Sequence, residues 1–351
     1  PLGAFLSGGI DSSLVTSGMQ SISSDPIKTF TIGFKENNWD EAQYAKSISD
    51  YLGTQHHETY VSFDEAIEII PQLPKIYSEP LADPSQVPTF ILSRVTKEKV
   101  IVALSGDGGD ELFCGYSRYE SARKIWNFLS YFPLGSRNLL KKRLLKTSPQ
   151  NWNFLLNFLK KSLPFIPKWS NPGDKILKGI NLIESTSHGE MYERLVQFWE
   201  DDTDLVTDLK LEPLINKKTD DGILNSFRNI EQAMLTDTKS FLSEDILVKV
   251  DRAAMAVSLE TRVPLLDADI YKFAWSLPIS MKSKDGEGKL ILKNVLKRYL
   301  EPKLFERPKM GFGVPVGEWL RGPLKDWAEE LINEKRLKDQ GFLSHKTVRK
   351  C

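Results

Sequence analysis

Cysteine is almost absent from this chain of 351 residues, which contains only Cys114 and Cys351. Two cysteines exclude a disulfide framework and a multi-cysteine metal site, and we expect a reducing, cytoplasmic location. A net charge is also lacking, because 47 basic residues balance 47 acidic ones. No global field therefore draws the chain toward nucleic acid or an anionic membrane, and we expect neither as a partner.

Long apolar runs are missing as well. No uninterrupted stretch approaches the roughly 20 apolar residues that span a bilayer, and no signal segment opens the chain. We expect a protein that is neither inserted into a membrane nor exported. The sequence begins without Met on a predicted strand and stops at Cys351 without a helix-ending signal, which favours an excised domain truncated at both ends.

The first third of the chain alternates short apolar runs with helical patterns, which is typical of a parallel sheet covered by helices. Strands are predicted at residues 2–6, 28–34, 57–61 and 100–104. Between the second and third strands, Asp40–Gln43 has the spacing of a capping box and Gly53 ends a predicted helix. The apolar face of that helix consists of Ala42, Ala45, Ile48 and Leu52.

From about Tyr119 to Lys239 helical patterns rich in aromatic residues replace the strands. We expect a nucleotide-binding core at residues 1–118, a mostly helical insertion at 119–239 and a C-terminal part at 240–351. Beside the basic run Lys141–Arg143, the aromatic side chains would suit the stacking of nucleic-acid bases. On this alternative the chain is an RNA-modifying enzyme, and its binding of RNA would weaken as the salt concentration rises. We favour a helix core instead, because the charge is balanced. The aromatic residues are Phe128, Tyr131, Phe132, Trp152, Phe154, Phe158, Phe165 and Trp169.

The most informative stretch follows the first predicted strand. Residues 7–13 read Ser-Gly-Gly-Ile-Asp-Ser-Ser and precede an apolar helical segment. A loop at a helix N-terminus presents backbone N–H groups and the positive end of the helix dipole to an anion, and Gly8 and Gly9 allow its close approach. The loop lacks the Lys of a P-loop and the spacing of a dinucleotide fingerprint, so we interpret it as a pyrophosphate cradle. Further donors are the hydroxyls of Ser7, Ser12 and Ser13.

A second loop of similar composition follows the strand predicted at 100–104. Residues 105–111 read Ser-Gly-Asp-Gly-Gly-Asp-Glu. The carboxyl ends of parallel strands meet at one edge of the sheet, where open α/β sheets bind their ligands. A carboxylate beside bound phosphate is favourable when it holds Mg²⁺, so we predict that Asp11 and Asp110 share one ion.

These two loops, in order with three later strings, resemble the synthetase domain of glutamine-hydrolysing asparagine synthetases of the bacterial asparagine synthetase B type. The later strings are Asp251–Ala256, Glu260–Asp267 and Arg307–Pro315. The first loop alone is typical of the wider PP-loop pyrophosphatase superfamily, whereas the five strings together are specific. The resemblance covers nearly the whole chain. It implies the α/β fold of adenine-nucleotide α-hydrolase-like (PP-loop) proteins, with a five-stranded parallel sheet, helices on both faces and a large helical insertion.

The resemblance also implies an ATP site. Leu6 and Ile32 would flank the adenine, and Ser105 and Gly106 would contact the nucleotide. The aspartates Asp11 and Asp110 would hold Mg²⁺ on the pyrophosphate.

A catalytic lysine is implied at Lys289, with Lys293, one helical turn later, as the alternative. A fixed ammonium would stabilise the charge that builds up on the α-phosphate during attack by a carboxylate. Asp107 stands where many relatives carry Glu and would reach toward the substrate amine or ammonia with one methylene less.

The implied reaction is the amidation of L-aspartate to L-asparagine through β-aspartyl-AMP, with ATP and Mg²⁺. The family's N-terminal glutaminase domain is absent from this sequence, so we expect no glutamine hydrolysis by this chain and expect that domain as its source of ammonia. A homodimer is a further expected partner state. Two alternatives stay open: a related PP-loop amide ligase that acts on another acid, as in polysaccharide or peptide biosynthesis, and a non-catalytic nucleotide-binding module.

Overall fold

A computed structural model describes residues 1–34, 42–144, 178–197, 205–207, 227–307, 314 and 316–350. The chain divides into two compact units. Unit 1 comprises Pro1–Tyr116 and Asp237–Ala328, and unit 2 comprises Ser117–Thr236 and Glu329–Cys351. All residues that the sequence suggests for a site belong to unit 1. The domain scheme with an insertion at 119–239 stays a prediction.

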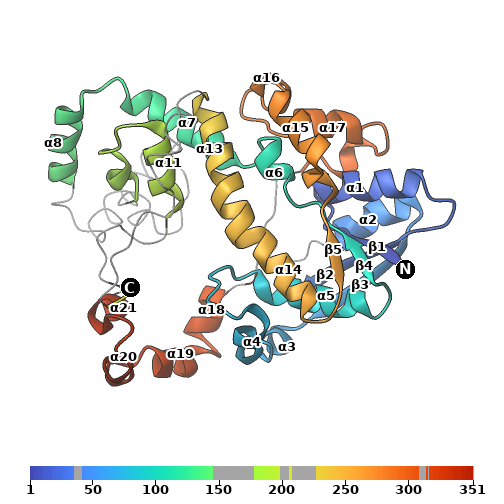
Figure 1. Cartoon of the computed structure of the whole chain (residues 1–351), viewed down its shortest axis with the longest axis horizontal. Helices are drawn as coiled ribbons and strands as arrows, with labels where there is room; N and C mark the ends of the chain where they lie inside the picture. The colour runs from blue at the N-terminus through green and yellow to red at the C-terminus, as the bar shows by residue number, and fades with distance from the viewer. Residues whose placement is uncertain are drawn as a thin grey trace, which may run out of the picture. The chain divides into compact units, whose positions relative to one another are not determined.

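A five-stranded parallel sheet organises unit 1 (Figure 1). The strands are ordered β3-β2-β1-β4-β5, and each neighbouring pair is parallel. The strand order reverses between β1 and β4, and this is the point of an open α/β sheet where ligands bind. The predicted α/β class with a five-stranded parallel sheet is confirmed. The strands are β1 (Leu2–Phe5), β2 (Lys28–Phe34), β3 (Gln55–Val61), β4 (Val102–Leu104) and β5 (Glu260–Arg262).

The four strands expected from the sequence are confirmed, with ends that differ by at most two residues. The fifth, β5, has no strand signal in the sequence. Its three residues, Glu260–Arg262, are polar and too few to show a period of two, and they become a strand by pairing with Val102–Leu104 of β4.

Helices cover both faces of the sheet. On β2 the last six of seven residues are buried, which requires apolar cover on either side. One group of packed helices comprises α1 (Ile10–Ser21), α2 (Ala42–Leu52) and α17 (Leu290–Leu296). The other comprises α5 (Gln86–Lys97) and α14 (Leu247–Met255), which lie side by side in Figure 1.

The predicted apolar face of α2 is confirmed. Ala42, Ala45 and Ile48 are fully buried, Leu52 is half-buried and packs against the same cluster, and Gly53 has a positive φ of 70° just after the helix. The capping box expected at Asp40–Gln43 begins outside the described residues.

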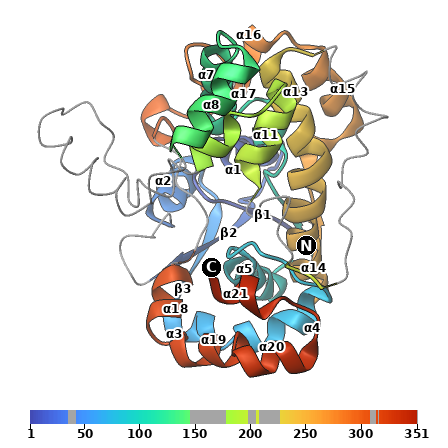
Figure 2. The same cartoon turned by 90° about the vertical axis from the view of Figure 1, so that its left-hand side faces the viewer.

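Shorter helical elements complete unit 1. The segment η3 (Thr238–Ile246) is a π-helix that continues directly into α14, as Figure 2 shows. The remaining elements are α3 (Phe63–Ile67), η2 (Ile70–Gln72), α4 (Leu73–Tyr77), α6 (Gly109–Leu112), η4 (Pro264–Leu266), α15 (Ala268–Ser276), α16 (Ile279–Lys282), η5 (Pro302–Leu304), α18 (Val316–Arg321) and α19 (Lys325–Leu331), which extends past the unit boundary.

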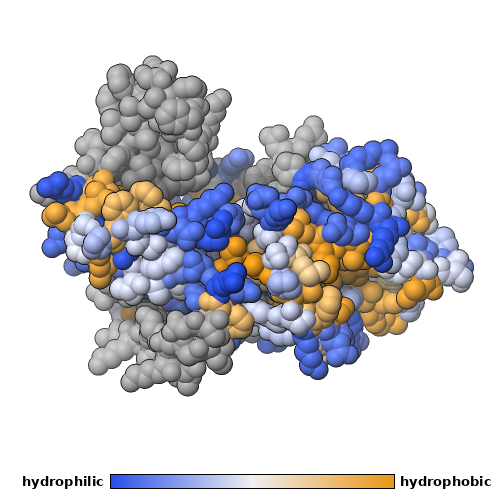
Figure 3. All heavy atoms as spheres, turned by 90° about the horizontal axis from the view of Figure 1, so that it is seen from above, coloured by the Kyte–Doolittle hydropathy of each residue, from blue (hydrophilic) through white to orange (hydrophobic). Residues whose placement is uncertain are grey.

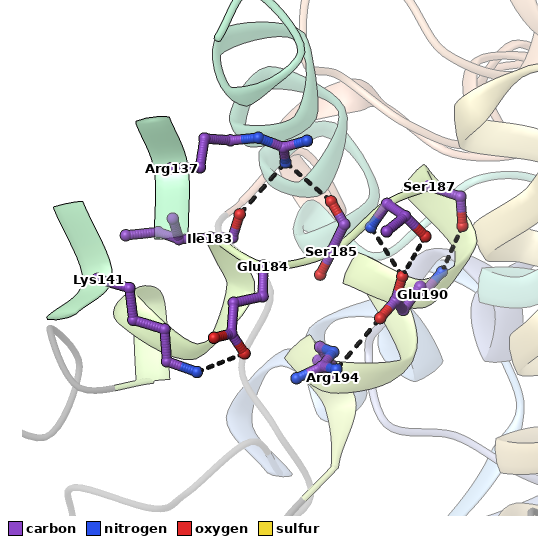
Figure 4. A network of polar contacts seen from close by, with 9 residues as sticks. Arg137, Lys141, Ile183, Glu184, Ser185, Ser187, Glu190 and Arg194 are labelled. Atoms are coloured by element: carbon purple, nitrogen blue, oxygen red, sulfur yellow. Dashed lines mark hydrogen bonds and ion pairs between the residues drawn. The ribbon is translucent and has the colours of Figure 1, made fainter. Parts of the chain in front are cut away.

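The described residues of unit 2 form mainly helices, and polar contacts join several of its segments (Figure 4). The buried guanidinium of Arg137 donates to the backbone oxygens of Ile183 at 3.2 Å and Ser185 at 2.8 Å. Ser187 caps α11 by accepting from the backbone N–H of Glu190. The helices are α7 (Ser117–Leu129), α8 (Leu134–Leu144), α11 (His188–Val196), α13 (Asn229–Asp237), α20 (Glu334–Gln340) and α21 (His345–Lys350).

The expected aromatic core of the middle region is wrong for the three residues that the structure describes. The exposed fractions are 64% for Phe128, 84% for Tyr131 and 46% for Phe132. Phe128 lies on α7, and Tyr131 and Phe132 lie between α7 and α8. Hydrophobic side chains also gather on the surface at the left of Figure 3. The other five aromatic residues, from Trp152 to Trp169, lie outside the described residues. None of the described helices is long and apolar enough to cross a membrane.

Candidate functional site

The first glycine loop lies between β1 and the start of α1. The N-cap of α1 is Gly9, which has no side chain to satisfy the first backbone N–H groups of the helix. The hydroxyl oxygens of Ser7 and Ser12 lie 2.9 Å apart across the loop, and the N–H of Gly9 donates to the Ser7 hydroxyl. The structure therefore has the strand-loop-helix arrangement expected for an anion cradle. Ser13 is fully buried in α1 rather than exposed at the loop.

The second glycine loop follows β4, the neighbour of β1, and packs directly against the first loop. A Cβ on Gly106 would lie 2.5 Å from the backbone nitrogen of Ser12, and one on Gly109 would lie 2.4 Å from a carboxylate oxygen of Asp11. Such distances are too short for any side chain. The glycines of this loop thus allow the two loops to touch.

Lys289 joins these loops from a distant part of the sequence. It is the N-cap of α17 and has a left-handed backbone with φ of 58°, and its N–H donates to the oxygen of Phe113 at 2.9 Å. Its ammonium pairs with Asp11 and lies 2.8 Å from a carboxylate oxygen of Asp110. The exposed fractions of the side chains are 8% for Lys289, 15% for Asp11 and 16% for Asp110.

The charge of Lys289 is retained in this setting. Burial by itself would lower the pKa of the ammonium, but the nearby carboxylates of Asp11 and Asp110 raise it above its usual value. Lys293, the alternative in the sequence, pairs instead with Glu287, whose side chain is 57% exposed. The geometry therefore favours Lys289 over Lys293 as the lysine of the site, while its catalytic role stays a prediction.

The carboxylates of Asp11 and Asp110 converge on one cation position, which the Lys289 ammonium takes in the structure. Among the described residues, no group of three or more His, Cys, Asp or Glu side chains gathers to hold a metal ion. Two carboxylates are nevertheless the protein share that Mg²⁺ commonly uses when phosphate oxygens and water complete its octahedron. The residues therefore fit a Mg²⁺ ion that arrives with a nucleotide.

Asp107 lies in the second loop with its carboxylate held by Ser105, whose hydroxyl donates to it at 2.5 Å. Burial raises the pKa of Asp107, and the hydrogen bond from Ser105 and then the charge of Lys249 on α14 oppose this shift. Leu6 and Ile32 are almost fully buried and belong to separate apolar clusters. Contacts of Leu6 and Ile32 with adenine remain a prediction.

A polar cluster that the sequence does not reveal lies near Asp107. Lys249 pairs with Asp83 and donates to the hydroxyl of Ser85 at 2.8 Å. Burial by itself would raise the pKa of Asp83, but Lys249 holds it below its usual value, whereas burial and Asp83 raise the pKa of Asp245 to about 6. Asp83 and Asp245 come from segments 162 residues apart and carry no shared motif, so only the packing of α5 on α14 brings them together.

Comparison with known proteins identifies the family of this chain. The sequence profile described as asparagine synthase matches residues 1–351. The chain belongs to the asparagine synthase family. The sheet described above is thus the PP-loop sheet of that family. The resemblance read from the five sequence strings is confirmed.

Several named members of the asparagine synthase family are similar to this chain. Asparagine synthetase [glutamine-hydrolyzing] 1 of Bacillus subtilis is 29% identical over 342 residues, which are 96% of this chain and 50% of that protein. A putative asparagine synthetase [glutamine-hydrolyzing] of Mycobacterium tuberculosis is 32% identical over 339 residues, or 95% of this chain and 48% of that protein. A putative asparagine synthetase [glutamine-hydrolyzing] 2 of Methanocaldococcus jannaschii is 35% identical over 262 residues, which are 73% of this chain and 45% of that protein. The chain spans about half the length of the relatives it matches.

Proposed function

We propose that this chain activates the side-chain carboxylate of L-aspartate with ATP and transfers the activated acyl group to ammonia, giving L-asparagine, AMP and pyrophosphate. One observation carries the proposal: two glycine loops and α17 bring Asp11, Asp110 and Lys289 to a single point at the carboxyl edge of the sheet. Enzymes that cleave ATP between its α- and β-phosphates need cations there. The names of the relatives support aspartate as the acid.

The proposed reaction has two steps. An aspartate carboxylate oxygen bonds to the α-phosphorus, while the bond from that phosphorus to the bridging oxygen breaks and pyrophosphate leaves with the electron pair. The nitrogen of ammonia then attacks the carbonyl carbon of β-aspartyl-AMP, AMP leaves, and a proton is lost from nitrogen. Both steps create negative charge beside phosphate, which a buried ammonium stabilises more strongly than water does.

The residues of the chain divide this work. The N–H groups at the start of α1, with the hydroxyls of Ser7 and Ser12, would receive phosphate oxygens. Asp11 and Asp110 would hold Mg²⁺, which neutralises charge on the phosphates when it is bound. The Lys289 ammonium would then lie beside the reacting phosphate. The left-handed backbone of Lys289, and the hydrogen bond from its N–H to the backbone oxygen of Phe113, fix the position from which its side chain extends.

We propose that a separate glutaminase domain supplies the ammonia, because the relatives are named glutamine-hydrolyzing. We also propose that the protein works in the cytoplasm. The chain described here would use ammonium directly.

The test measures ATP–pyrophosphate exchange with Mg²⁺ and a panel of acids: L-aspartate, L-glutamate, succinate, β-alanine and a hexuronic acid. We expect exchange with L-aspartate. Exchange with another acid alone would replace aspartate by that acid and support a related amide ligase. No exchange with any acid, while ATP still binds, would support a non-catalytic nucleotide-binding module.

A second assay follows the products. With ATP, Mg²⁺, L-aspartate and ammonium, the chain should form asparagine and AMP in equal amounts. Glutamine in place of ammonium should give no product from this chain, because the hydrolysis of glutamine is assigned to the glutaminase domain.

A further inference from the structure

Arg307 is the first residue of the string Arg307–Pro315, to which the mechanism above gives no role. Its guanidinium carbon lies 3.9 Å from the centre of the Tyr44 ring, so the guanidinium stacks on an aromatic face. A nitrogen of the same guanidinium donates to the backbone oxygen of Ser7 at 3.4 Å. The Arg307 guanidinium, which is distant from the first glycine loop in the sequence, is thus held at the edge of that loop.

Tyr44 supports the loop as well as the arginine. Gly8 has a positive φ of 74°, and a Cβ on it would lie 2.8 Å from the Cβ of Tyr44. The loop backbone therefore rests on the first turns of α2, and the ring of Tyr44 extends from the same place to Arg307. One residue fixes the distance between the loop and the guanidinium.

Even with a Mg²⁺ ion held by Asp11 and Asp110, the phosphates of a nucleotide bring more negative charge to this loop than that ion neutralises. Within the loop, Asp11 carries a negative charge, and the nearest ammonium, Lys289, is shared between Asp11 and Asp110. When the bond to the α-phosphorus breaks, the electron pair stays on pyrophosphate and its charge rises. An arginine is suited to this leaving group because its planar guanidinium donates two parallel bonds to phosphate oxygens and stays charged at any working pH.

We propose that Arg307 binds the β- and γ-phosphates of the nucleotide and the pyrophosphate that leaves, and that Tyr44 is the positioning residue that holds Arg307 beside the loop. This inference rests on the proposed function and deepens it. It assigns a pyrophosphate-binding role to a residue outside the two glycine loops.

The first test measures the binding of inorganic pyrophosphate by calorimetry, in the presence of Mg²⁺, so that turnover is not required. Arg307→Ala should weaken binding by roughly tenfold to a hundredfold, the usual effect of losing hydrogen bonds to a charged group. Arg307→Lys keeps the charge but loses the planar pair of donors, and should fall between Ala and the wild type. Arg298→Ala is the matched control, because Arg298 is exposed and has the same charge.

The role of Tyr44 is tested by two substitutions. Tyr44→Phe keeps the ring and should bind pyrophosphate as the wild type does. Tyr44→Leu removes the aromatic face and should weaken pyrophosphate binding several-fold, with a smaller effect on the KM for the acid. Thermal melting of each variant separates a loss of the contact from a loss of the fold.

The outcomes distinguish this inference from the proposed function. If Arg307→Ala and Arg307→Lys bind pyrophosphate as tightly as Arg298→Ala while the wild type catalyses exchange, the role of Arg307 is refuted and the proposed function stands. If the wild type binds pyrophosphate through Arg307 but exchanges with no acid, the proposed function fails and the binding role stands. If the wild type binds no pyrophosphate, the inference is refuted.

Discussion

Replacement of Lys289 by Met would leave Asp11 and Asp110 buried side by side without the ammonium between them. Met has nearly the length of Lys, so the substitution removes the charge and largely keeps the packing. The two carboxylates would then repel each other at a place where their side chains are only 15% and 16% exposed. We expect the folded state to lose stability in the absence of Mg²⁺.

The size of this loss follows from the burial of the three side chains. Removal of one partner from a buried ion pair costs about 3–5 kcal/mol. Because both aspartates keep some contact with water, we expect the lower end, about 3 kcal/mol. For a unit of about 200 residues, 1 kcal/mol lowers Tm by about 2–4 °C, so the Lys289→Met variant should melt about 6–12 °C below the wild type.

Differential scanning calorimetry in EDTA, and then with increasing Mg²⁺, is the assay. Lys293→Met is the matched control, because it removes the same charge from the same helix but breaks only a pair with the exposed Glu287. Such a pair contributes about 0–1 kcal/mol, so the control should melt within about 4 °C of the wild type. Mg²⁺ should stabilise Lys289→Met more than the wild type, because it binds where the ammonium was.

Equal melting temperatures for Lys289→Met and the wild type in EDTA would refute the buried ion pair. Equal losses for both lysine variants would show that α17, rather than the convergence of the carboxylates, accounts for the effect. A larger loss of melting temperature for Lys293→Met than for Lys289→Met would identify Lys293 as the lysine of the site.

Two further predictions concern the second loop and the cluster beside it. Gly106→Ala should weaken ATP binding in calorimetry by at least about tenfold, because its Cβ would lie 2.5 Å from the backbone nitrogen of Ser12 and push the loops apart. Gly18→Ala, with nothing within 4 Å, should bind ATP normally and be up to about 1 kcal/mol more stable. Asp245 has a pKa of about 6 in the fold, against about 3.9 when unfolded, so its contribution to stability is complete below about pH 4 and is lost as pH rises through 6. Asp245→Asn should remove that fall in urea denaturation between pH 4 and 7, and an unchanged pH profile would contradict the assignment.

The two glycine loops were predictable because each is a continuous stretch with local physical meaning. Glycine and serine at the end of a buried strand predict a turn that accepts an anion, whatever the rest of the chain does. The lysine was predictable only through the family resemblance. Nothing local favours a lysine at the N-cap of a helix in a left-handed conformation, and Lys289 has φ of 58°.

The cluster of Asp83, Asp245 and Lys249, and the stacking of Arg307 on Tyr44, were not predictable from the sequence. Each joins residues more than 150 positions apart through side chains that are common on protein surfaces. The burial of the cluster and the shifted pKa values of Asp83 and Asp245 exist only after α5 packs on α14. The guanidinium reaches the ring only when the chain returns to the first loop.

The sequence by itself determined four of the five strands, the loops and the family, because hydrophobic period, glycine placement and motif order are properties of short segments. The tertiary structure alone decided which charges meet. It placed one lysine between two aspartates 99 residues apart, made a strand of Glu260–Arg262 and set Arg307 against Tyr44. Electrostatic energy depends on the distance between atoms and their burial, and neither exists before the chain has folded.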